Sequence, residues 1–298
     1  MNKFICIDIG GTAIKSGILN AAQEILFQQE TPTKASEGGP VLAKQVYDIV
    51  CQLKEKEPAA AGIAISTAGV INSQTTEILY ASSAIPAYKG VCYKDVLRPL
   101  GLPVEAENDV NCAGLAEYSS GSAKGASSAL ILTVGTGIGG CFILNGQLLN
   151  GSSYSACEVG YLPMQGGMFQ DLASTTTLVQ NVAQAKGEEA SQWDGRKIFE
   201  GASGGDVICQ SGIDQLCDRL AEGMAALCFV LNPEVVVLGG GIMAQKAVLE
   251  QPIKKYFAAH SIPLIADATR IEFASHENTA GMKGALAHFL VRHPMLAN

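Results

Sequence analysis

Short apolar runs alternate along the chain with longer segments in which apolar residues recur every three or four positions. FICIDIG (4–10) and AGIAIST (61–67) are short, apolar and rich in β-branched residues, which predicts buried strands. The segment between them, VLAKQVYDIVCQLKEK (41–56), has the period of a helix. Further on, PVEAEND (103–109) predicts a strand, followed by a small-residue helix over 110–120. Alternating strands and helices favour a layered α/β fold.

The plan of residues 3–26 is repeated over residues 129–149. In each segment an apolar strand is followed by a glycine turn, a second strand that closes on ILN, and a third short strand. Such self-similarity indicates an internal duplication. We therefore expect two related domains, each with one glycine turn near its start.

The second glycine turn matches the spacing of a dinucleotide-binding loop, but its surroundings do not. Gly135, Gly137 and Gly140 satisfy G-x-G-x-x-G, yet the next segment, CFILNGQLLNG, predicts a strand ending at the hairpin turn Asn145-Gly146. A dinucleotide-binding loop would open a helix there. A glycine turn between two strands can still hold phosphate through its backbone N–H groups. The alternative, that the glycines only allow tight hairpins, stays open at this point.

Composition narrows the class of protein. The chain has 298 residues, a net charge of −8, and 20 Lys and Arg residues that form no cluster, so we expect no nucleic-acid partner. No apolar run approaches the roughly 18 residues of a membrane span, and MNKFICIDIGG is too short for a signal peptide, so we expect a cytoplasmic protein. Nine cysteines without paired spacing indicate reduced, mostly buried thiols. The four histidines, at 260, 276, 288 and 293, lie far along the chain from both glycine turns and from PVEAEND, which disfavours histidine-dependent catalysis.

Four motifs, in this order, resemble those of the ROK family of sugar kinases and sugar-responsive repressors, within the actin-like ATPase superfamily. They are DIGGTAIKSG, ENDVNCAGLAE, TVGTGIGG and PEVVVLGGGI, and the resemblance continues to AGMKGALAHFL. It implies an α/β, two-lobed actin-like ATPase (ribonuclease H-like) fold with duplicated βββαβ-type halves and a central cleft. The smaller lobe would be residues 1–112 plus 277–298, and the larger lobe residues 113–276.

Two departures from the family pattern narrow the expected function within the family. Repressors of this family carry a DNA-binding winged helix before the kinase-like part, whereas the first phosphate turn of this chain starts at Asp8, so we expect a kinase. The family's structural zinc is held by a His and a cysteine run, but Tyr161 stands in the place of the His and no cysteine lies between Cys157 and Cys209. We expect no structural zinc. This combination resembles the β-glucoside kinase subgroup, which phosphorylates the 6-hydroxyl of β-linked disaccharides.

On the acceptor side, the resemblance implies ATP-dependent phosphorylation of the 6-hydroxyl of a β-glucoside or a glucose-like hexose. Asp109 would be the catalytic base; without the resemblance it would be interpreted as a helix cap. Asn108 can both donate to and accept from sugar hydroxyls, whereas Glu158 can only accept. The substrate-binding residues so implied are Gly69, Asn108, Asp109, Glu158 and Tyr161. ASSAIPAYKG (81–90) resembles the family's sugar-side loop, with an ordinary proline turn as the alternative.

On the nucleotide side, the resemblance implies ATP and Mg²⁺ as cofactors, with Asp8 holding Mg²⁺ through water. The residues implied to face the nucleotide are Asp8, Gly10, Gly11, Thr12, Lys15, Gly135, Thr136, Gly137, Gly239 and Gly240. Lys15 is equally compatible with a solvated surface charge. The triple glycine at 239–241 either admits a ligand close to the backbone or allows dense packing.

Two other functions stay open from the sequence. One is a non-catalytic, sugar-sensing regulator of the ROK type, and the other is a kinase for another hexose such as mannose or N-acetylmannosamine. In each case the expected partner is a small-molecule sugar, with no membrane and no nucleic acid. The family resemblance implies a homodimer.

Overall fold

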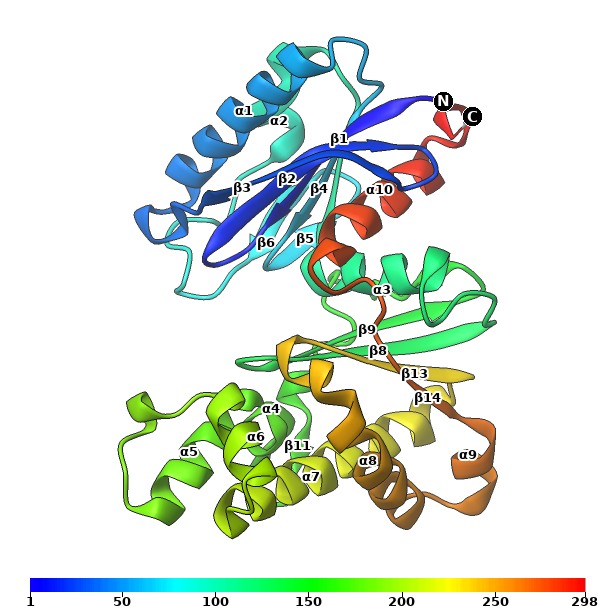
Figure 1. Cartoon of the computed structure of the whole chain (residues 1–298). Coiled ribbons are helices and arrows are strands. Elements are labelled where there is room, and N and C mark those ends of the chain that lie inside the picture. Colours follow the sequence, from blue (N-terminus) through cyan, green and yellow to red (C-terminus); the bar gives the residue numbers. More distant parts are fainter. Residues whose placement is uncertain (298) are drawn as a thin grey trace. The chain divides into compact units, whose positions relative to one another are not determined.

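A computed structural model describes residues 1–297, which form two compact units (Figure 1). Unit 1 comprises Met1–Lys124, Leu148–Ala156 and Asn278–Asn298, and unit 2 comprises Gly125–Gln147 and Cys157–Glu277. These bounds differ from those of the expected lobes. Unit 1 extends beyond residue 112 because helix α3 (Asp109–Ser120) packs closely against the C-terminal helix α10 (Ala280–Arg292).

Unit 1 is built on a five-stranded sheet with the order β3-β2-β1-β4-β7. Its strands are β1 (Lys3–Ile9), β2 (Ala13–Asn20), β3 (Ile25–Pro32), β4 (Ile63–Thr67) and β7 (Val104–Asn108). The first three strands form an antiparallel meander, while β1, β4 and β7 run parallel. The strands expected from FICIDIG, AGIAIST and PVEAEND are therefore confirmed.

Helices cover both faces of this sheet, which explains why the sequence of β1 shows so little alternation. Ile5, Ile7 and Ile9 pack toward helices α1 (Gly39–Lys56) and α2 (Tyr93–Leu97). Phe4 points to the opposite face, where its ring lies 5.3 Å from that of Phe289 on α10. Figure 1 shows α1 and α2 on one side of the sheet and α10 on the other.

Short elements complete unit 1. A two-stranded hairpin consists of β5 (Val70–Asn72) and β6 (Glu77–Tyr80). The 3-10 turns are η1 (Ala35–Glu37), η2 (Arg98–Leu100) and η7 (Pro294–Leu296). Another 3-10 turn, η6 (Glu277–Thr279), leads into α10 from unit 2.

Unit 2 repeats the plan of unit 1, which confirms the internal duplication. Its main sheet has the order β10-β9-β8-β13-β14, with β8 antiparallel to β9 and parallel to β13, and β13 parallel to β14. The strands are β8 (Ser128–Val134), β9 (Ile138–Leu144), β10 (Gln147–Leu148), β13 (Val235–Gly239) and β14 (Arg270–Phe273). As expected for a type I′ turn, Asn145 and Gly146 between β9 and β10 have φ values of 50° and 79°.

Helices pack on one face of the second sheet. Leu130, Leu132 and Val134 of β8 share a core with the long helix α7 (Val207–Leu231) and its neighbours. The other helices of unit 2 are α4 (Phe169–Ala173), α5 (Thr175–Lys186), α6 (Gly195–Ser203), α8 (Lys246–His260) and α9 (Pro263–Ala268). Its short elements are β11 (Pro163–Met164), β12 (Gly167–Met168), η3 (Val159–Tyr161), η4 (Ala190–Gln192) and η5 (Gly241–Gln245).

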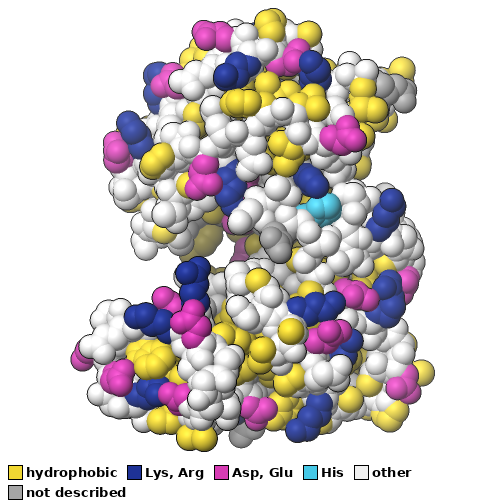
Figure 2. All heavy atoms as spheres, in the orientation of Figure 1, with side chains coloured by type: hydrophobic (Ala, Val, Ile, Leu, Met, Phe, Trp, Pro, Cys, Tyr) yellow, Lys and Arg dark blue, Asp and Glu magenta, His cyan; other side chains and the backbone are white. Residues whose placement is uncertain are grey.

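The nine cysteines are all free thiols and most are buried, in keeping with their interpretation as small apolar residues. Among the described helices, none combines the length and the apolar character needed to cross a membrane. On the face drawn in Figure 2, basic and acidic side chains are interspersed over both units.

Candidate functional site

The corner between β7 and α3 is held by the side chain of Asn108. Its Oδ1 accepts hydrogen bonds from the backbone N–H groups of Val110 (2.9 Å) and Asn111 (3.0 Å), so Asn108 is the N-cap of α3. Its Nδ2 donates to Asp109 Oδ1 (2.9 Å) and to the carbonyl of Gly69 (3.1 Å). Both amide hydrogens and the amide oxygen are thus used within the protein. A sugar could bind the Asn108 side chain directly only by displacing one of these bonds.

Asp109 stands at the first position of α3 and is half-buried as a residue. Burial, and next the negative charge of Asp8, raise its pKa to about 6, although hydrogen bonds from Val110 and Asn108 act in the opposite direction. A carboxylate that takes up a proton near neutral pH is well matched to the role of general base for a hydroxyl.

Asp8 lies on β1 between two polar neighbours. Its Oδ1 accepts a hydrogen bond from Ser66 Oγ (2.8 Å), and it is paired in register with Lys15 on β2. Burial raises the pKa of Asp8, while Ser66 and Lys15 hold it down. Lys15 also donates to Asn278 (3.3 Å). Gly281 of α10 is so close that a Cβ there would lie 2.2 Å from the carboxylate carbon of Asp8.

This single carboxylate fits the coordination habits of magnesium. Mg²⁺ keeps several waters and takes only one or two protein carboxylates, the remaining ligands coming from substrate phosphates. Within residues 1–297, no three His, Cys, Asp or Glu side chains gather as ligands of one metal ion. A structural zinc site would need a group of about four such side chains.

The first glycine turn connects β1 to β2 and leaves its backbone accessible. The N–H of Gly10 bonds the carbonyl of Ala13 (3.0 Å), and the carbonyl of Thr12 accepts from Thr33 (3.0 Å). Gly11 and Thr12 are exposed, and no atom lies within 4 Å of the position that a Cβ on Gly11 would take. The turn is fixed at both ends and open in the middle, as a phosphate-binding turn needs to be.

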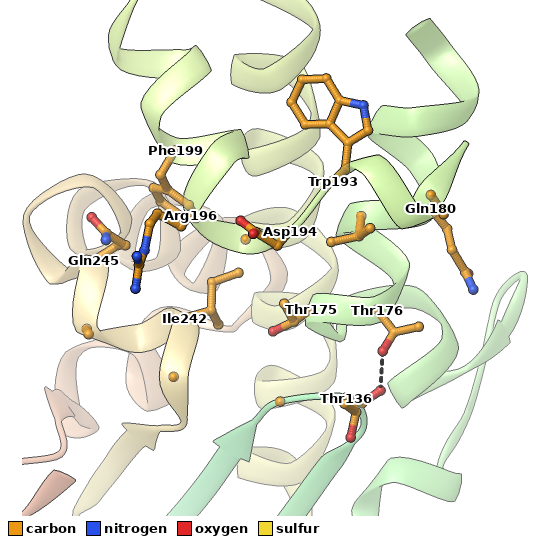
Figure 3. A pocket seen from close by; sticks show the side chains of 16 residues that line it. Thr136, Thr175, Thr176, Gln180, Trp193, Asp194, Arg196, Phe199, Ile242 and Gln245 are labelled. Atoms are coloured by element: carbon orange, nitrogen blue, oxygen red, sulfur yellow. Dashed lines mark hydrogen bonds between the residues drawn. The ribbon is translucent and has the colours of Figure 1, made fainter. Parts of the chain in front are cut away.

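The second glycine turn connects β8 to β9 and is anchored by the start of α5. The N–H of Gly135 bonds Gly137 (2.9 Å), and the N–H of Thr175 donates to the carbonyl of Gly135 (2.9 Å). The hydroxyl of Thr176 donates to the carbonyl of Thr136 (2.9 Å), the bond drawn as a dashed line in Figure 3. No neighbouring atom fills the space above Gly135. The structure therefore brings a fixed, open turn to the N-terminus of a helix, which favours anion binding.

A pocket of about 710 Å³ opens beside this second turn, wholly within unit 2. Arg196 and Gln245 lie on one side of it and Trp193 across from them (Figure 3). Its lining is Gly135, Thr136, Thr175, Thr176, Val179, Gln180, Ala190, Trp193, Asp194, Gly195, Arg196, Phe199, Gly241, Ile242, Ala244 and Gln245. A mixed lining of apolar and polar side chains and this volume are compatible with a small-molecule site. Of these residues, the sequence analysis assigned only Gly135 and Thr136 to the nucleotide side.

The triple glycine touches the pocket through its last member. Gly241 lines the pocket, whereas Gly239 and Gly240 do not appear in its wall. A Cβ on Gly240 would lie 2.2 Å from the carbonyl of Val134, and Gly240 has φ +101°. Dense packing on β8 therefore explains this glycine, and the contact of Gly239 and Gly240 with a nucleotide stays a prediction.

Glu158 precedes the 3-10 turn η3 in unit 2, and Tyr161 is the last residue of this turn. The N–H of Tyr161 donates to the carbonyl of Glu158 (3.2 Å), and Tyr161 is 57% exposed. Partial burial raises the pKa of Glu158. Cys157, just before it, has φ 64°, an uncommon conformation for a residue other than glycine. Both predicted sugar contacts are therefore on a surface turn, available to a ligand.

The aromatic residue of segment 81–90, Tyr88, is buried and therefore not accessible to a ligand. Tyr88 is 1% exposed, and its hydroxyl lies 2.6 Å from Thr67 Oγ1 and 2.7 Å from the hydroxyl of Tyr93. Gly39, at the start of α1, packs against the backbone of Ala87 and donates to Pro86. This favours the interpretation of the segment as a structural turn.

The histidines are closer to the motifs in space than along the chain. His288 on α10 has its Nδ1 3.8 Å from Glu107 Oε2, and His293 Nε2 lies 3.0 Å from Glu105 Oε1. His288 and His293 therefore lie close to β7 in space, although they are far from it along the chain. The sequence could not show it, because α10 returns to β7 only through the tertiary fold.

Comparisons with known proteins agree with these features. The ROK family model matches residues 4–292. An uncharacterized protein of Clostridium perfringens is 43% identical over 97% of this chain and 98% of its own length, and a β-glucoside kinase of Listeria innocua is 32% identical over 97% of both. A solved ROK family protein of Streptococcus pneumoniae, in complex with sucrose, is 30% identical with a TM-score of 0.85, covering 98% of this chain and 99% of the other.

Proposed function

This chain belongs to the ROK family, and we propose that it is an ATP-dependent kinase that phosphorylates the 6-hydroxyl of a sugar. We propose a β-glucoside as its preferred acceptor. The observation that carries the proposal is the carboxylate of Asp109, oriented by Asn108 and with its pKa raised to about 6 at the start of α3.

The acceptor side of the reaction is assigned to the corner of β7 and α3. Asp109 accepts the proton of the sugar hydroxyl as this oxygen attacks the γ-phosphorus of ATP. Asn108 holds the carboxylate in place, and the backbone at Gly69 borders the same corner. On unit 2, the carboxylate of Glu158 accepts hydrogen bonds from sugar hydroxyls, and Tyr161 donates one from its phenol.

The donor side is assigned to the two glycine turns and the pocket of unit 2. The turns Gly10–Thr12 and Gly135–Gly137 bind phosphate oxygens through backbone N–H groups. The pocket takes the nucleoside, with its aromatic and aliphatic walls against the base. Asp8 holds Mg²⁺ through water, and this ion, when bound, offsets the phosphate charge that develops during transfer.

The preference for a β-glucoside rests on Tyr161 and on the similar kinase of Listeria innocua. The exposed ring of Tyr161 stands where the family resemblance places a histidine that binds zinc. An aromatic ring at this position provides a face on which a second sugar can stack. Glucose-like hexoses are the next candidates.

A coupled assay of ADP release tests the proposal. Glucose, cellobiose, gentiobiose, mannose and N-acetylmannosamine are each incubated with protein, ATP and Mg²⁺, and NMR identifies the oxygen that becomes phosphorylated. We expect the highest kcat/KM for a β-linked disaccharide and a phosphate on O6. Sugar binding without ADP release from any member of the panel would instead favour a non-catalytic sensor. If mannose or N-acetylmannosamine is turned over fastest, the preferred acceptor is that hexose and not a β-glucoside.

A further inference from the structure

A buried carboxylate lies directly beneath the corner that carries Asp109. Glu107, the penultimate residue of β7, is 2% exposed. Its Oε1 accepts a hydrogen bond from the backbone N–H of Asn108 (2.8 Å) and another from the side-chain Nδ2 of Asn111 (3.0 Å). One oxygen therefore holds both the residue that orients Asp109 and the first turn of α3.

The second oxygen of Glu107 makes no comparable interaction. In the part of the chain that the structure describes, Oε2 has no hydrogen-bond partner, and the nearest basic group is His288 Nδ1 at 3.8 Å. Burial raises the pKa of Glu107 and lowers that of His288 to about 4, so His288 is neutral at physiological pH. Hydrogen bonds from Asn111 and Asn108, and then Ser73 and the charge of Arg292, oppose the rise in the pKa of Glu107. Its shortest polar contacts are the two at the corner.

Glu105 provides an internal comparison, because it lies two residues earlier on the same strand and the same face. It is also buried, but its carboxylate pairs with Lys94 (3.3 Å), Arg292 (3.0 Å) and His293 (3.0 Å). Glu105 therefore ties α2 and α10 to the sheet without contacting Asn108. The two neighbouring buried glutamates therefore differ: Glu105 forms ion pairs that join elements, whereas Glu107 accepts its two short hydrogen bonds from the corner.

We propose that Glu107 is a positioning residue for phosphoryl transfer, which fixes the backbone of Asn108 and the side chain of Asn111 and thereby sets the direction of the Asp109 carboxylate. This proposal rests on the proposed kinase function. The positioning role requires a hydrogen-bond acceptor at Oε1 but no charge on Glu107. Both partners are N–H donors, and an amide oxygen can also accept their hydrogen bonds.

The test compares Glu107→Ala and Glu107→Gln with the matched control Glu105→Ala. We expect Glu107→Ala to lower kcat by about 10- to 100-fold, as for a misplaced general base, and to raise the KM for the sugar with the KM for ATP unchanged. Glu107→Gln should stay within about threefold of the wild type, because its amide oxygen accepts the same two hydrogen bonds. Glu105→Ala should lower the melting temperature with kcat within about threefold of the wild type.

Two outcomes would overturn the proposal: a Glu107→Gln variant as slow as Glu107→Ala, or a Glu105→Ala variant with the same loss of kcat. If Glu107→Ala does not fold, Asn111→Ala removes one of the two donors from the helix side and should lower kcat in the same direction.

An NMR titration of the Asp109 carboxyl carbon separates this proposal from the kinase assignment. If the wild-type protein proves inactive, only the kinase assignment is overturned. The positioning role of Glu107 can still be tested, because the titration needs no turnover. We expect the midpoint to fall in Glu107→Ala or Asn111→Ala, where the loosened corner admits water, and to stay in place in Glu107→Gln and Glu105→Ala. An unmoved midpoint in Glu107→Ala and Asn111→Ala would overturn the positioning role.

Discussion

The side-chain amide of Asn108 donates a hydrogen bond to the carboxylate of Asp109, with Nδ2 and Oδ1 2.9 Å apart. The same amide donates to Gly69 and caps α3 through its oxygen, so it is held at both ends. Asp109 is therefore oriented before any ligand arrives. A base that needs no reorganisation when the hydroxyl is deprotonated lowers the barrier more than a freely rotating one.

Replacing this carboxylate should remove turnover and leave the fold intact. Asp109→Asn keeps the size of the side chain and an oxygen for the bonds from Asn108 and Val110, but it cannot take up the hydroxyl proton. We expect kcat to fall by about two to four orders of magnitude with little change in sugar affinity. Steady-state kinetics and calorimetric sugar titration measure the two quantities. The exposed acid Asp48 on α1 provides a control, and turnover of Asp109→Asn equal to that of Asp48→Asn would rule out base catalysis by Asp109.

The pH profile should report the raised pKa of Asp109. Because the base acts in its charged form, we expect kcat/KM for the sugar to decline below a pH of about 6, with a slope of one on the acid side. Burial and the charge of Asp8 set this midpoint, so Asp8→Asn should move it to lower pH. An acid limb with a midpoint near 4, the value of a free aspartate, would contradict the environment described for Asp109.

The same titration should affect stability in the opposite sense. The pKa of Asp109 is raised from 3.8 to about 6 in the folded state, so folding favours the protonated carboxyl. The resulting contribution to the free energy of unfolding is fully present below pH 3.8 and is lost as the pH rises through about 6. At pH 8 the charged form costs up to about 3 kcal/mol, which Asp109→Asn avoids. The variant should therefore melt at a higher temperature than the wild type at pH 8 and at the same temperature near pH 3. A variant that is less stable at pH 8 would contradict this sign.

The strands could be predicted because they depend on local pattern. The run FICIDIG is apolar on both faces since Ile5 and Phe4 meet helices on opposite sides of the sheet. The turn Asn145-Gly146 was predictable since few residue pairs adopt two positive φ values. The duplication was visible because both halves use the same sequence of strand, turn and strand.

The long-range contacts of the site could not be predicted in this way. Gly281 meets Asp8 only because α10 crosses back over β1, and no periodicity in AGMKGALAHFL encodes its partner. The pocket wall likewise joins Arg196 of α6 to Ile242, which follows β13. The motifs identified the residues at strand ends, where backbone geometry restricts the sequence. They missed those that tertiary packing brings in from helices.

The pocket assignment can be tested through Trp193, the one tryptophan of the chain. Its indole lines the pocket and donates to Glu188 (2.8 Å), so a bound nucleotide should change its emission. We expect ATP and ADP to shift the fluorescence in a saturable manner. Arg196→Ala, which removes a cation from the wall, should weaken binding by about tenfold. Lys254→Ala, an exposed change on α8 outside the pocket wall, is the control, and nucleotide-saturable turnover with no fluorescence change would place the nucleoside elsewhere.

The contact between Gly281 and Asp8 leads to a prediction about magnesium. An alanine at this helical position would gain about 1 kcal/mol in helix propensity, but its Cβ would lie 2.2 Å from the Asp8 carboxylate carbon and overpacking costs about 1–3 kcal/mol. We therefore expect Gly281→Ala to displace Asp8, lower the melting temperature slightly and raise the Mg²⁺ concentration for half-maximal rate several-fold, with the KM for the sugar unchanged.

Gly204→Ala is the matched control for this substitution, since its nearest neighbours would be 3.4 and 3.5 Å away and its φ is negative. It should leave both the melting temperature and the Mg²⁺ dependence close to those of the wild type. A Gly281→Ala enzyme that melts earlier but needs no more Mg²⁺ would separate packing from metal binding, and would mean that Asp8 does not hold the ion. A higher Mg²⁺ requirement shared by Gly281→Ala and a conservative Asp8→Asn change would instead assign the ion to this carboxylate, because the two substitutions alter it by different routes.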